Sequence, residues 1–181
     1  METDSIQLLS DDERFLRNKD LIPQGKLDDI TVIGAGGIGS ALITNAAIMG
    51  FKHIRIWDHD VLEAHNLSTT TYPTHHLYSP KARAAEHQAK EYGAKVVTPH
   101  TKLWRQGDPL SRKVFMAPDN MEVRREVYET WKSNPRREFL IDMRMGALSM
   151  EIVTVTKEED RFMEDWMASD DIADESCTAK H

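Results

Sequence analysis

A glycine-rich loop early in the chain constrains the fold more than any other stretch of the sequence. The loop covers residues 34–39 and follows residues 30–33, a β-branched run typical of a buried strand. Residues 40–49 are apolar and alanine-rich, which predicts a helix. A second strand is expected over residues 53–57, directly before Asp58. This order of strand, glycine loop, helix, strand and acid predicts a Rossmann-like α/β unit.

The glycines of the loop each have a physical reason to be there. Gly34 permits a tight turn, Gly36 lets backbone N–H groups approach a phosphate, and Gly39 lets the helix pack closely on the strand. The helix N-terminus adds unpaired donors and the positive end of the helix dipole. Asp58 lies about 20 residues beyond the loop, where a carboxylate meets ribose hydroxyls. These features predict a nucleotide site, and the kind of nucleotide stays open at this point.

Two more polar residues follow the second strand. Asp60 lies two residues beyond Asp58, on the same face of an extended strand end, and Asn66 comes six residues later. Two carboxylates and an amide beside a phosphate site can hold ribose, Mg²⁺ or a triphosphate, and a nicotinamide site needs none of this extra polarity. The competing interpretation is that Asp60 and Asn66 only cap and turn the loop.

A lysine stands at the start of the next expected helix. Residues 81–92 form this helix, and Lys81 follows Pro80, a residue that favours helix starts. A cation in the first turn is unfavourable with the helix dipole, so Lys81 is easier to explain if an anion binds there. A solvated surface lysine is the alternative.

Asp119 occupies a comparable position later in the chain. It lies between an expected strand over residues 114–117 and an expected helix over residues 121–133. Because open α/β sheets bind ligands at the carboxyl ends of their parallel strands, Asp119 is a candidate metal ligand or electrostatic group. An ordinary helix-capping role competes with this interpretation.

The remaining patterns extend the unit into one sheet. Further strands are expected over residues 95–98, 139–143 and 149–156, and a short helix over residues 14–19. The expected fold is a Rossmann-like, doubly wound, mostly parallel sheet with an N-terminal helix. The expected division is an N-terminal helical arm (1–29), a nucleotide-binding domain (30–156) and an acidic crossover or mobile segment (157–181).

Composition narrows the partners and the compartment. The chain has 181 residues and a formal net charge of −7, which argues against nucleic acid or an anionic membrane as the main partner. No apolar run approaches the roughly 20 residues of a membrane span and no signal peptide opens the chain, so a cytoplasmic protein is expected. Cys177 is the single cysteine, which excludes internal disulfides and zinc sites built from several cysteines.

Several motifs, in this order, resemble the ThiF/MoeB/ubiquitin-activating-enzyme superfamily. They are the loop Gly34-Ala35-Gly36-Gly37-Ile38-Gly39-Ser40, Asp58-x-Asp60 with Asn66-Leu67, Lys81-Ala82, and Asp119-Asn120-x-x-x-Arg124. The match runs from about Arg14 to Thr156, and Arg14-Phe15-x-Arg17 is similar to the family's N-terminal Arg-Tyr-x-Arg element. Members of this superfamily adenylate the C-terminal carboxylate of a ubiquitin-like or sulfur-carrier protein.

The resemblance implies a role for most of the matched residues. Asp58 is expected to hold the ribose hydroxyls of ATP, and the loop backbone at Gly36 and Gly37 to cradle the phosphates. Asn66 and Lys81 are expected to bind the triphosphate.

Two implied roles reach beyond nucleotide binding. Asp119 is expected to coordinate Mg²⁺ or to orient the α-phosphate for attack. Arg17 is expected to reach the phosphates bound by a partner subunit, which implies a homodimer. The implied partner is a small protein or peptide with a free C-terminal carboxylate.

Three departures from the family pattern bear on activity. The family usually continues Asn-Leu-x-Arg-Gln, but Thr69 stands where the arginine is expected. Losing one preorganised cation typically costs ~10²–10³ in rate, so either another cation replaces it or activity is weak. The family's zinc-binding cysteine pairs are missing, as in many relatives. The chain is also short for the family, as a shortened member or a truncated chain, and Cys177 is either an acceptor thiol or an incidental cysteine.

Three hypotheses follow from the sequence. The first is an ATP- and Mg²⁺-dependent adenylyltransferase acting on a C-terminal carboxylate. The second is a nucleotide-binding scaffold that has lost catalysis, because of Thr69 and the short chain. The third is an NAD-dependent oxidoreductase, which rests on the glycine loop and Asp58 alone.

Overall fold

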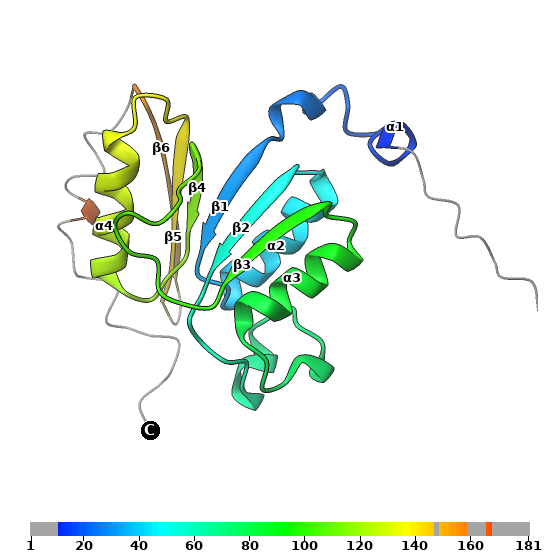
Figure 1. Cartoon of the computed structure of the whole chain (residues 1–181), viewed down its shortest axis with the longest axis vertical. Coiled ribbons are helices and arrows are strands. Elements are labelled where there is room, and N and C mark those ends of the chain that lie inside the picture. The colour runs from blue at the N-terminus through cyan, green and yellow to red at the C-terminus, as the bar shows by residue number, and fades with distance from the viewer. Residues whose placement is uncertain (1–10, 147–148, 159–165, 168–181) are drawn as a thin grey trace, which may run out of the picture.

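A mostly parallel sheet forms the centre of the molecule, with strand order β3-β2-β1-β4-β5-β6 (Figure 1). The computed structural model describes residues 11–146, 149–158 and 166–167. The strands are β1 (Asp29–Ile33), β2 (His53–Trp57), β3 (Val96–His100), β4 (Lys113–Met116), β5 (Phe139–Met145) and β6 (Met150–Thr156). The first five are parallel, and β6 returns antiparallel to β5. The expected fold class is therefore confirmed, with β6 as the hairpin partner of β5.

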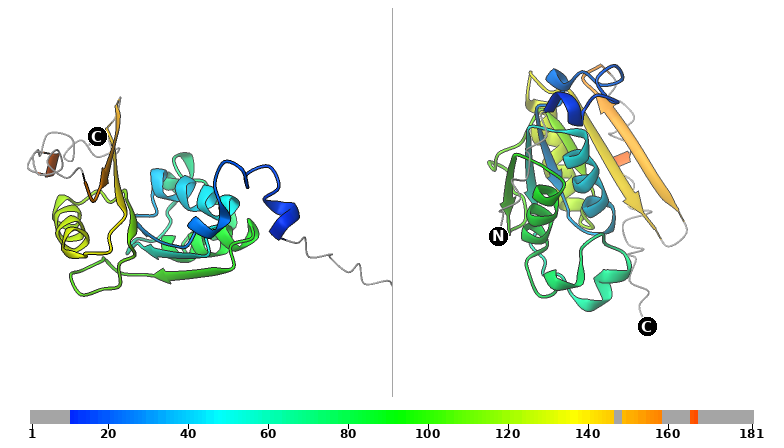
Figure 2. Two further views of the ribbon diagram at one scale, coloured as in Figure 1. Left: turned by 90° about the horizontal axis from the view of Figure 1, so that it is seen from above. Right: turned by 90° about the vertical axis from the view of Figure 1, so that its right-hand side faces the viewer.

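Helices cover both faces of the sheet (Figure 2). The helices are α1 (Asp11–Arg14), α2 (Gly37–Met49), α3 (Lys81–Glu91) and α4 (Met121–Ser133), and short 3₁₀ turns cover Gln24–Lys26, Ala64–Ser68 and Thr74–His76. Apolar residues of α2 and α3 pack into one hydrophobic cluster, and those of α4 pack into a second. The two clusters cover opposite faces of the sheet and make it doubly wound.

Helix α2 begins at Gly37, three residues before its expected start, so part of the glycine loop forms its first turn. The helix ends at Met49 and is capped by Gly50, whose φ of +95° lies in the left-handed region that favours glycine. Helix α3 keeps its expected start and ends at Glu91. Ala82, Ala85 and Ala89 of this helix are buried in the hydrophobic cluster, whereas Tyr92 is 46% exposed.

The N-terminal helix differs from the prediction. Helix α1 covers four residues, Asp11–Arg14, instead of residues 14–19. Phe15 is buried, whereas Leu16 is exposed, although a surface helix over residues 14–19 would dock both side chains. Residues 15–20 after the helix form turns, with the N–H groups of Asn18 and Lys19 donating to the carbonyl of Phe15.

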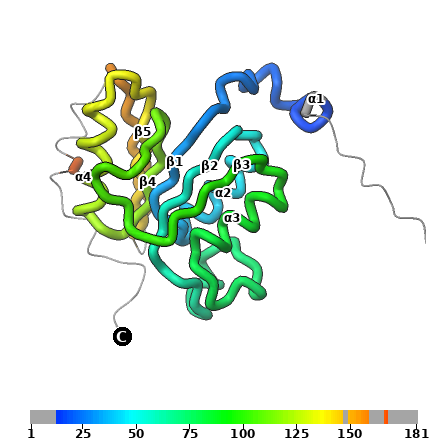
Figure 3. Tube along the Cα trace, viewed as in Figure 1, coloured from blue at the N-terminus to red at the C-terminus, as the bar shows by residue number. Residues whose placement is uncertain are grey.

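Arg14 connects the N-terminal segment to the C-terminal ends of two helices. Its guanidinium donates to the carbonyl of Ala47 at 2.8 Å, to that of Gly93 at 2.8 Å, and to that of Tyr92. These carbonyls lie at helix ends, where backbone acceptors lack partners within the helix and a cation is favoured. The N-terminal segment is thereby held at the end of the sheet opposite the carboxyl ends of β1 and β2 (Figure 3).

The remaining elements match their expectations to within a few residues. Helix α4 has its expected bounds, β3 starts one residue later than expected and continues to His100, and β5 continues to Met145. Most of the acidic segment 157–181, including Cys177, lies outside the described residues. None of the helices in the described part of the chain is long and apolar enough to cross a lipid bilayer.

Candidate functional site

A cavity of about 340 Å³ opens at the carboxyl ends of the parallel strands. It lies where the strand order reverses, because β1 has β2 on one side and β4 on the other. Crevices at this position are the usual ligand sites of open α/β sheets. The residues predicted from sequence that line it are Gly34, Gly36, Gly37, Asp58, Asp60, Asn66, Lys81 and Asp119.

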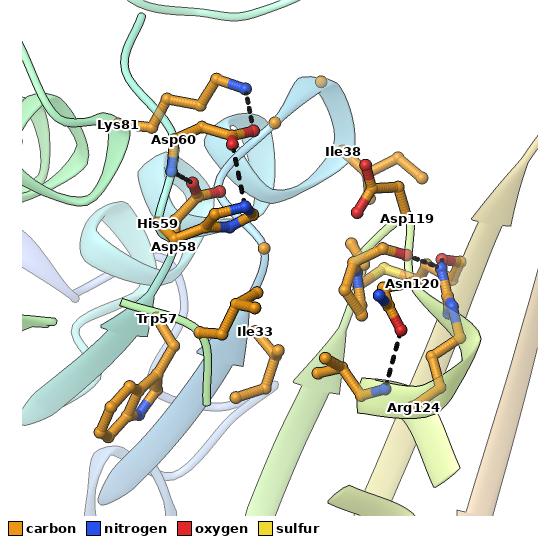
Figure 4. Close-up of a pocket in the computed structure, with 18 of the residues that line it drawn as sticks. Ile33, Ile38, Trp57, Asp58, His59, Asp60, Lys81, Asp119, Asn120 and Arg124 are labelled. Carbon is orange, nitrogen blue, oxygen red and sulfur yellow. Dashed lines mark hydrogen bonds and ion pairs between the residues drawn. The ribbon is translucent and has the colours of Figure 1, made fainter. Parts of the chain in front are cut away.

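Figure 4 shows how the charged residues divide between two sides of the cavity. Asp58, Asp60 and Lys81 lie on the side formed by the end of β2 and the start of α3. Asp119 and Arg124 lie on the other side, at the junction of β4 and α4.

The glycine loop needs its glycines for steric reasons. Gly34 has a φ of +89°, and a Cβ there would lie 2.5 Å from the carbonyl oxygen of Ala117. A Cβ on Gly39 would lie 1.9 Å from the carbonyl oxygen of Gly34, so this glycine allows α2 to pack against the loop. Gly39 therefore supports the site without lining the cavity. At Gly36 a Cβ would meet nothing within 4 Å, which leaves open space beside the loop backbone.

Backbone N–H groups hold the Asp58 carboxylate in one orientation. Its Oδ2 accepts from the N–H of Ala35 at 2.6 Å, and its Oδ1 accepts from the N–H of Asp60 at 2.8 Å. Burial raises the pKa of the Asp58 carboxyl above its usual value, and the two backbone hydrogen bonds only partly oppose this. Asp58 is thus a fixed acceptor at the edge of the cavity, suited to hydroxyl donors.

Lys81 is buried and ion-paired. Its side chain is 11% exposed, and its Nζ lies 2.8 Å from Oδ2 of Asp60. Asp60 also lies 3.3 Å from Nε2 of His59. Because its side chain is buried and paired, Lys81 is not the solvated surface lysine of the alternative interpretation, and the Asp60 carboxylate offsets its unfavourable interaction with the helix dipole.

Asn66 serves the local turn as well as lining the cavity. Its Oδ1 accepts from the N–H of Glu63 at 3.0 Å, as part of a capping box on the 3₁₀ helix Ala64–Ser68. The turn-forming role considered from sequence is therefore present. The amide nitrogen of Asn66 has no hydrogen bond within the described part of the chain.

Asp119 is exposed, and the helix-capping role falls to its neighbour. Oδ1 of Asn120 accepts from the N–H of Val123 at 3.2 Å, which caps α4. Within residues 11–146, 149–158 and 166–167, the Asp119 carboxylate makes no hydrogen bond or ion pair. Its oxygens face the cavity region across from Asp60 (Figure 4).

A second group of possible metal ligands lies at the end of β2. One ligand atom each from Asp58, His59 and Asp60 lie within 4.8 Å of one another. Within the described residues, no other cluster of this kind is present. From the sequence, Asp119 was the expected metal ligand and Mg²⁺ was one of the ligands considered for Asp58 and Asp60, but His59 was not predicted.

Several residues that line the cavity were not predicted from the sequence. Trp57 is buried and stacks on His100 with ring centroids 3.7 Å apart, and Trp104 lies beside it. Arg144 is 2% exposed and comes from β5. The signal that could have revealed Arg144 is a charged residue two positions after Asp142, inside an otherwise apolar strand.

Arg17 does not line the cavity of its own chain. It is exposed and lies in the N-terminal segment, away from the carboxyl ends of the strands. Its expected role at a partner subunit's site stays a prediction.

The fold and the glycine loop define a protein of the Rossmann-like α/β class. The chain belongs to the ThiF family, whose model matches residues 24–157. It is 34% identical over 106 residues to the SUMO-activating enzyme subunit 2 of Dictyostelium discoideum, which covers 54% of this chain and 16% of that protein. It is 38% identical over 64 residues to the SUMO-activating enzyme subunit uba-2 of Caenorhabditis elegans, covering 35% of this chain and 11% of the relative. The chain spans less than a fifth of either relative.

Solved structures share the fold at lower identity. PaaA superposes with a TM-score of 0.66 at 19% identity, covering 84% of this chain and 54% of PaaA. The tRNA N6-threonylcarbamoyladenosine dehydratase TcdA of E. coli gives a TM-score of 0.65 at 19% identity, covering 75% and 62%. E. coli MccB, solved with AMPCPP and MccA, gives 0.57 at 17% identity, covering 66% and 38%.

Proposed function

We propose that this chain is an ATP-dependent adenylyltransferase. Its substrate is the C-terminal carboxylate of a small ubiquitin-like or sulfur-carrier protein, or of a peptide. The observation that carries the proposal is the convergence of the glycine loop, Asp58, Lys81 and Asp119 on one cavity at the switch point of the sheet.

In the proposed reaction, an oxygen of the acceptor carboxylate attacks the α-phosphorus of ATP. The new O–P bond makes an acyl adenylate, and the bond from the α-phosphorus to the bridging oxygen breaks and releases pyrophosphate. A carboxylate is already ionised at neutral pH. The reaction therefore needs alignment and charge neutralisation more than a general base.

The residues that line the cavity supply these two requirements. Asp58 is rigidly held by two backbone N–H groups and is suited to accept from the ribose hydroxyls. Backbone N–H groups at Gly36 and Gly37 face phosphates at the start of α2. Lys81, positioned by Asp60, neutralises triphosphate charge, and Asn66 offers its amide nitrogen as a donor.

The donor set also fits Mg²⁺. Carboxylate oxygens are preferred ligands of this ion, so exposed Asp119 is a suitable ligand, and Asp58 and Asp60 provide further oxygens on the other side of the cavity. Magnesium, when bound, supplies additional charge neutralisation at the phosphates. Asp119 is the residue that would hold this ion.

Two comparisons support the choice of nucleotide and substrate. TcdA has been solved in complex with ATP, and MccB with AMPCPP and MccA. The relatives identified by sequence are subunits of SUMO-activating enzymes. By the same family pattern we propose that the protein is a homodimer in which Arg17 reaches the partner's phosphates.

One observation favours a second candidate, a nucleotide-binding scaffold without catalysis. Thr69 is neutral where the family pattern has an arginine. ATP binding without pyrophosphate exchange, across the acceptors tested below, is the result that would select the scaffold.

The proposed function is tested by ATP–pyrophosphate exchange. Wild-type protein, Mg²⁺, ATP and labelled pyrophosphate are mixed with a panel of small proteins ending in Gly-Gly and of short peptides. We expect acceptor-dependent exchange that falls at least ~100-fold in Asp119→Asn, because alignment and charge neutralisation at the α-phosphate are lost. The control is Glu122→Gln, a neighbouring exposed acid in the first turn of α4 that does not line the cavity. Undiminished exchange in Asp119→Asn would refute the assigned site.

The redox alternative is tested separately by thermal unfolding. A ligand that binds the folded state raises its stability by RT ln(1 + [L]/Kd). We expect Mg·ATP to raise the unfolding temperature and NAD at the same concentration to leave it unchanged. Selective stabilisation by NAD would favour an oxidoreductase instead.

A further inference from the structure

Two buried guanidinium groups share one carboxylate beside the cavity. Arg124 is 5% exposed, Arg144 2% and Asp142 0%. Arg124 donates to Oδ1 of Asp142, and Nε of Arg144 donates to Oδ2 at 3.0 Å. The three side chains together carry one excess positive charge. Two further carboxylates lie near the group, because Asp119 acts electrostatically on Arg124 and Glu151 of β6 is the cross-strand partner of Arg144.

The hydrogen bonds of the two arginines differ. Arg124 also donates to the carbonyls of Pro118 and Met143, so both of its terminal nitrogens have partners. In Arg144, Nη2 donates to the carbonyl of Trp166 at 3.2 Å. Its Nη1 is buried and has no hydrogen-bond partner within the residues that the structure describes. A guanidinium has five N–H donors, so Arg144, unlike Arg124, has a terminal nitrogen whose N–H donors are unused.

Arg144 lines the same cavity as the glycine loop. The position where the family pattern has an arginine is also beside that loop, since a Cβ on Gly37 would lie 3.0 Å from the carbonyl oxygen of Thr69. Thr69 itself carries no charge. Lys81 is already paired with Asp60. The cavity therefore lacks the arginine that the family pattern has at residue 69. It has instead an arginine at residue 144, which is not part of that pattern.

We propose that Arg144 is a phosphate-binding residue that takes over the task of the arginine missing at position 69. This inference rests on the proposed function, because it assumes that ATP occupies the cavity. Asp142 and Trp166 position the guanidinium: the carboxylate accepts from Nε, and the guanidinium carbon lies 4.1 Å from the centre of the Trp166 ring. A guanidinium is well suited to phosphate because its planar fork donates two parallel hydrogen bonds.

The test compares ATP with adenosine, which has the same base and ribose but no phosphate. Mg·ATP and adenosine are titrated calorimetrically into wild type, Arg144→Gln and Arg144→Lys. We expect Arg144→Gln to bind ATP about 10- to 100-fold more weakly, as for the loss of a charged hydrogen bond. Adenosine binding should stay unchanged, and Arg144→Lys, which keeps the charge but loses the planar fork, should bind ATP more weakly than wild type and more tightly than Arg144→Gln. Arg112→Gln is the matched control, because that exposed arginine pairs with Asp28 away from the cavity.

A gain-of-charge variant and a spectroscopic readout complete the experiment. Adding Thr69→Arg to Arg144→Gln should restore ATP affinity, because Thr69 is exposed and stands at the family's arginine position. If Arg144→Gln does not fold, the Nε–Hε nuclear magnetic resonance signal of Arg144 in wild type should shift with Mg·ATP and stay in place with adenosine. Unchanged ATP affinity, equal losses for ATP and adenosine, or an unmoved signal would overturn the inference. Failure of wild type to bind ATP at all would instead remove the proposed function on which it rests.

Discussion

The ammonium group of Lys81 lies 2.8 Å from the Asp60 carboxylate, at the edge of the cavity that both residues line. Lys81 is in the first turn of α3 and Asp60 follows β2, so the pair joins two elements of the site. The lysine is thereby positioned before any ligand arrives. A cation positioned in advance costs little to reorganise when phosphate binds.

This pair predicts that Lys81→Ala weakens ATP binding about tenfold or more, because a charge-assisted hydrogen bond to phosphate is lost. Adenosine binding should not change. Calorimetric titration measures both affinities, and Lys90→Ala is the control, a cation of the same helix that pairs with Glu86 outside the cavity. Equal ATP affinities for Lys81→Ala and Lys90→Ala would show that Lys81 does not meet the triphosphate.

The glycine loop predicts different main effects for two alanine substitutions, on stability for Gly39→Ala and on ATP binding for Gly36→Ala. Gly39→Ala should destabilise the fold by about 3 kcal/mol, because its Cβ would lie 1.9 Å from the carbonyl oxygen of Gly34. Gly36→Ala meets no atom within 4 Å and should cost about 1 kcal/mol, as expected for an N-cap position. Its Cβ should nevertheless obstruct a phosphate. Denaturant unfolding and ATP titration separate the two effects, and a Gly36→Ala protein with full ATP affinity would contradict the phosphate role of the loop.

A cluster of three histidines predicts a pH-dependent stability. His76 is 6% exposed, and its ring packs between those of His75 and His87. Burial lowers the pKa of His76, as do the two neighbouring histidines, while Glu91 opposes the shift. The unfolded chain then binds a proton more readily than the folded protein, so stability is full above the unfolded pKa of about 6.5 and declines as the pH falls through the lowered value.

The measurement is the unfolding temperature of wild type and His76→Leu between about pH 7.5 and 5.5. Wild type should lose more stability than the variant on acidification. The leucine is compatible with the site because Nε2 of His76 is buried and has no hydrogen-bond partner among the described residues. His65→Gln, at an exposed position, is the control and should follow wild type. Identical pH profiles for wild type and His76→Leu would exclude His76 as the titrating group.

The proposed role of Arg17 predicts complementation between subunits. Arg17→Ala and Asp119→Ala homodimers should each be nearly inactive in pyrophosphate exchange. Mixing and re-equilibrating them should restore up to about a quarter of wild-type sites, because one site of a mixed dimer then has both residues intact. No recovery in a mixture shown to exchange subunits would argue against a role for Arg17 across the interface.

Regular elements with local signals could be predicted from sequence. The bounds of β2 and α4 agree with the prediction, because β-branched residues and a capping asparagine mark them in the sequence itself. Helix α1 was predicted wrongly: it covers Asp11–Arg14, and Arg14 at its end contacts carbonyls at the ends of α2 and α3. Contacts of that kind arise only once the chain has folded.

The residues of the candidate site also divide into those that local sequence signals predict and those that depend on contacts between separate elements. The positions of Asp58 and the loop followed from spacing along the chain, and the structure brings them to one cavity. The ion pair of Lys81 with Asp60 and the place of Arg144 could not be predicted, because they join separate elements. For Arg144, the only local sign of a role is that it is a charged residue in an apolar strand.

The most direct measurement is a crystal structure of the protein with Mg²⁺ and a non-hydrolysable ATP analogue. The proposed function predicts ribose hydroxyls on Asp58, phosphates over the glycine loop, and Lys81 and Asp119 contacting the phosphates or their metal ion. A bound nucleotide from which Lys81 and Asp119 both point away would contradict the proposed adenylylation site.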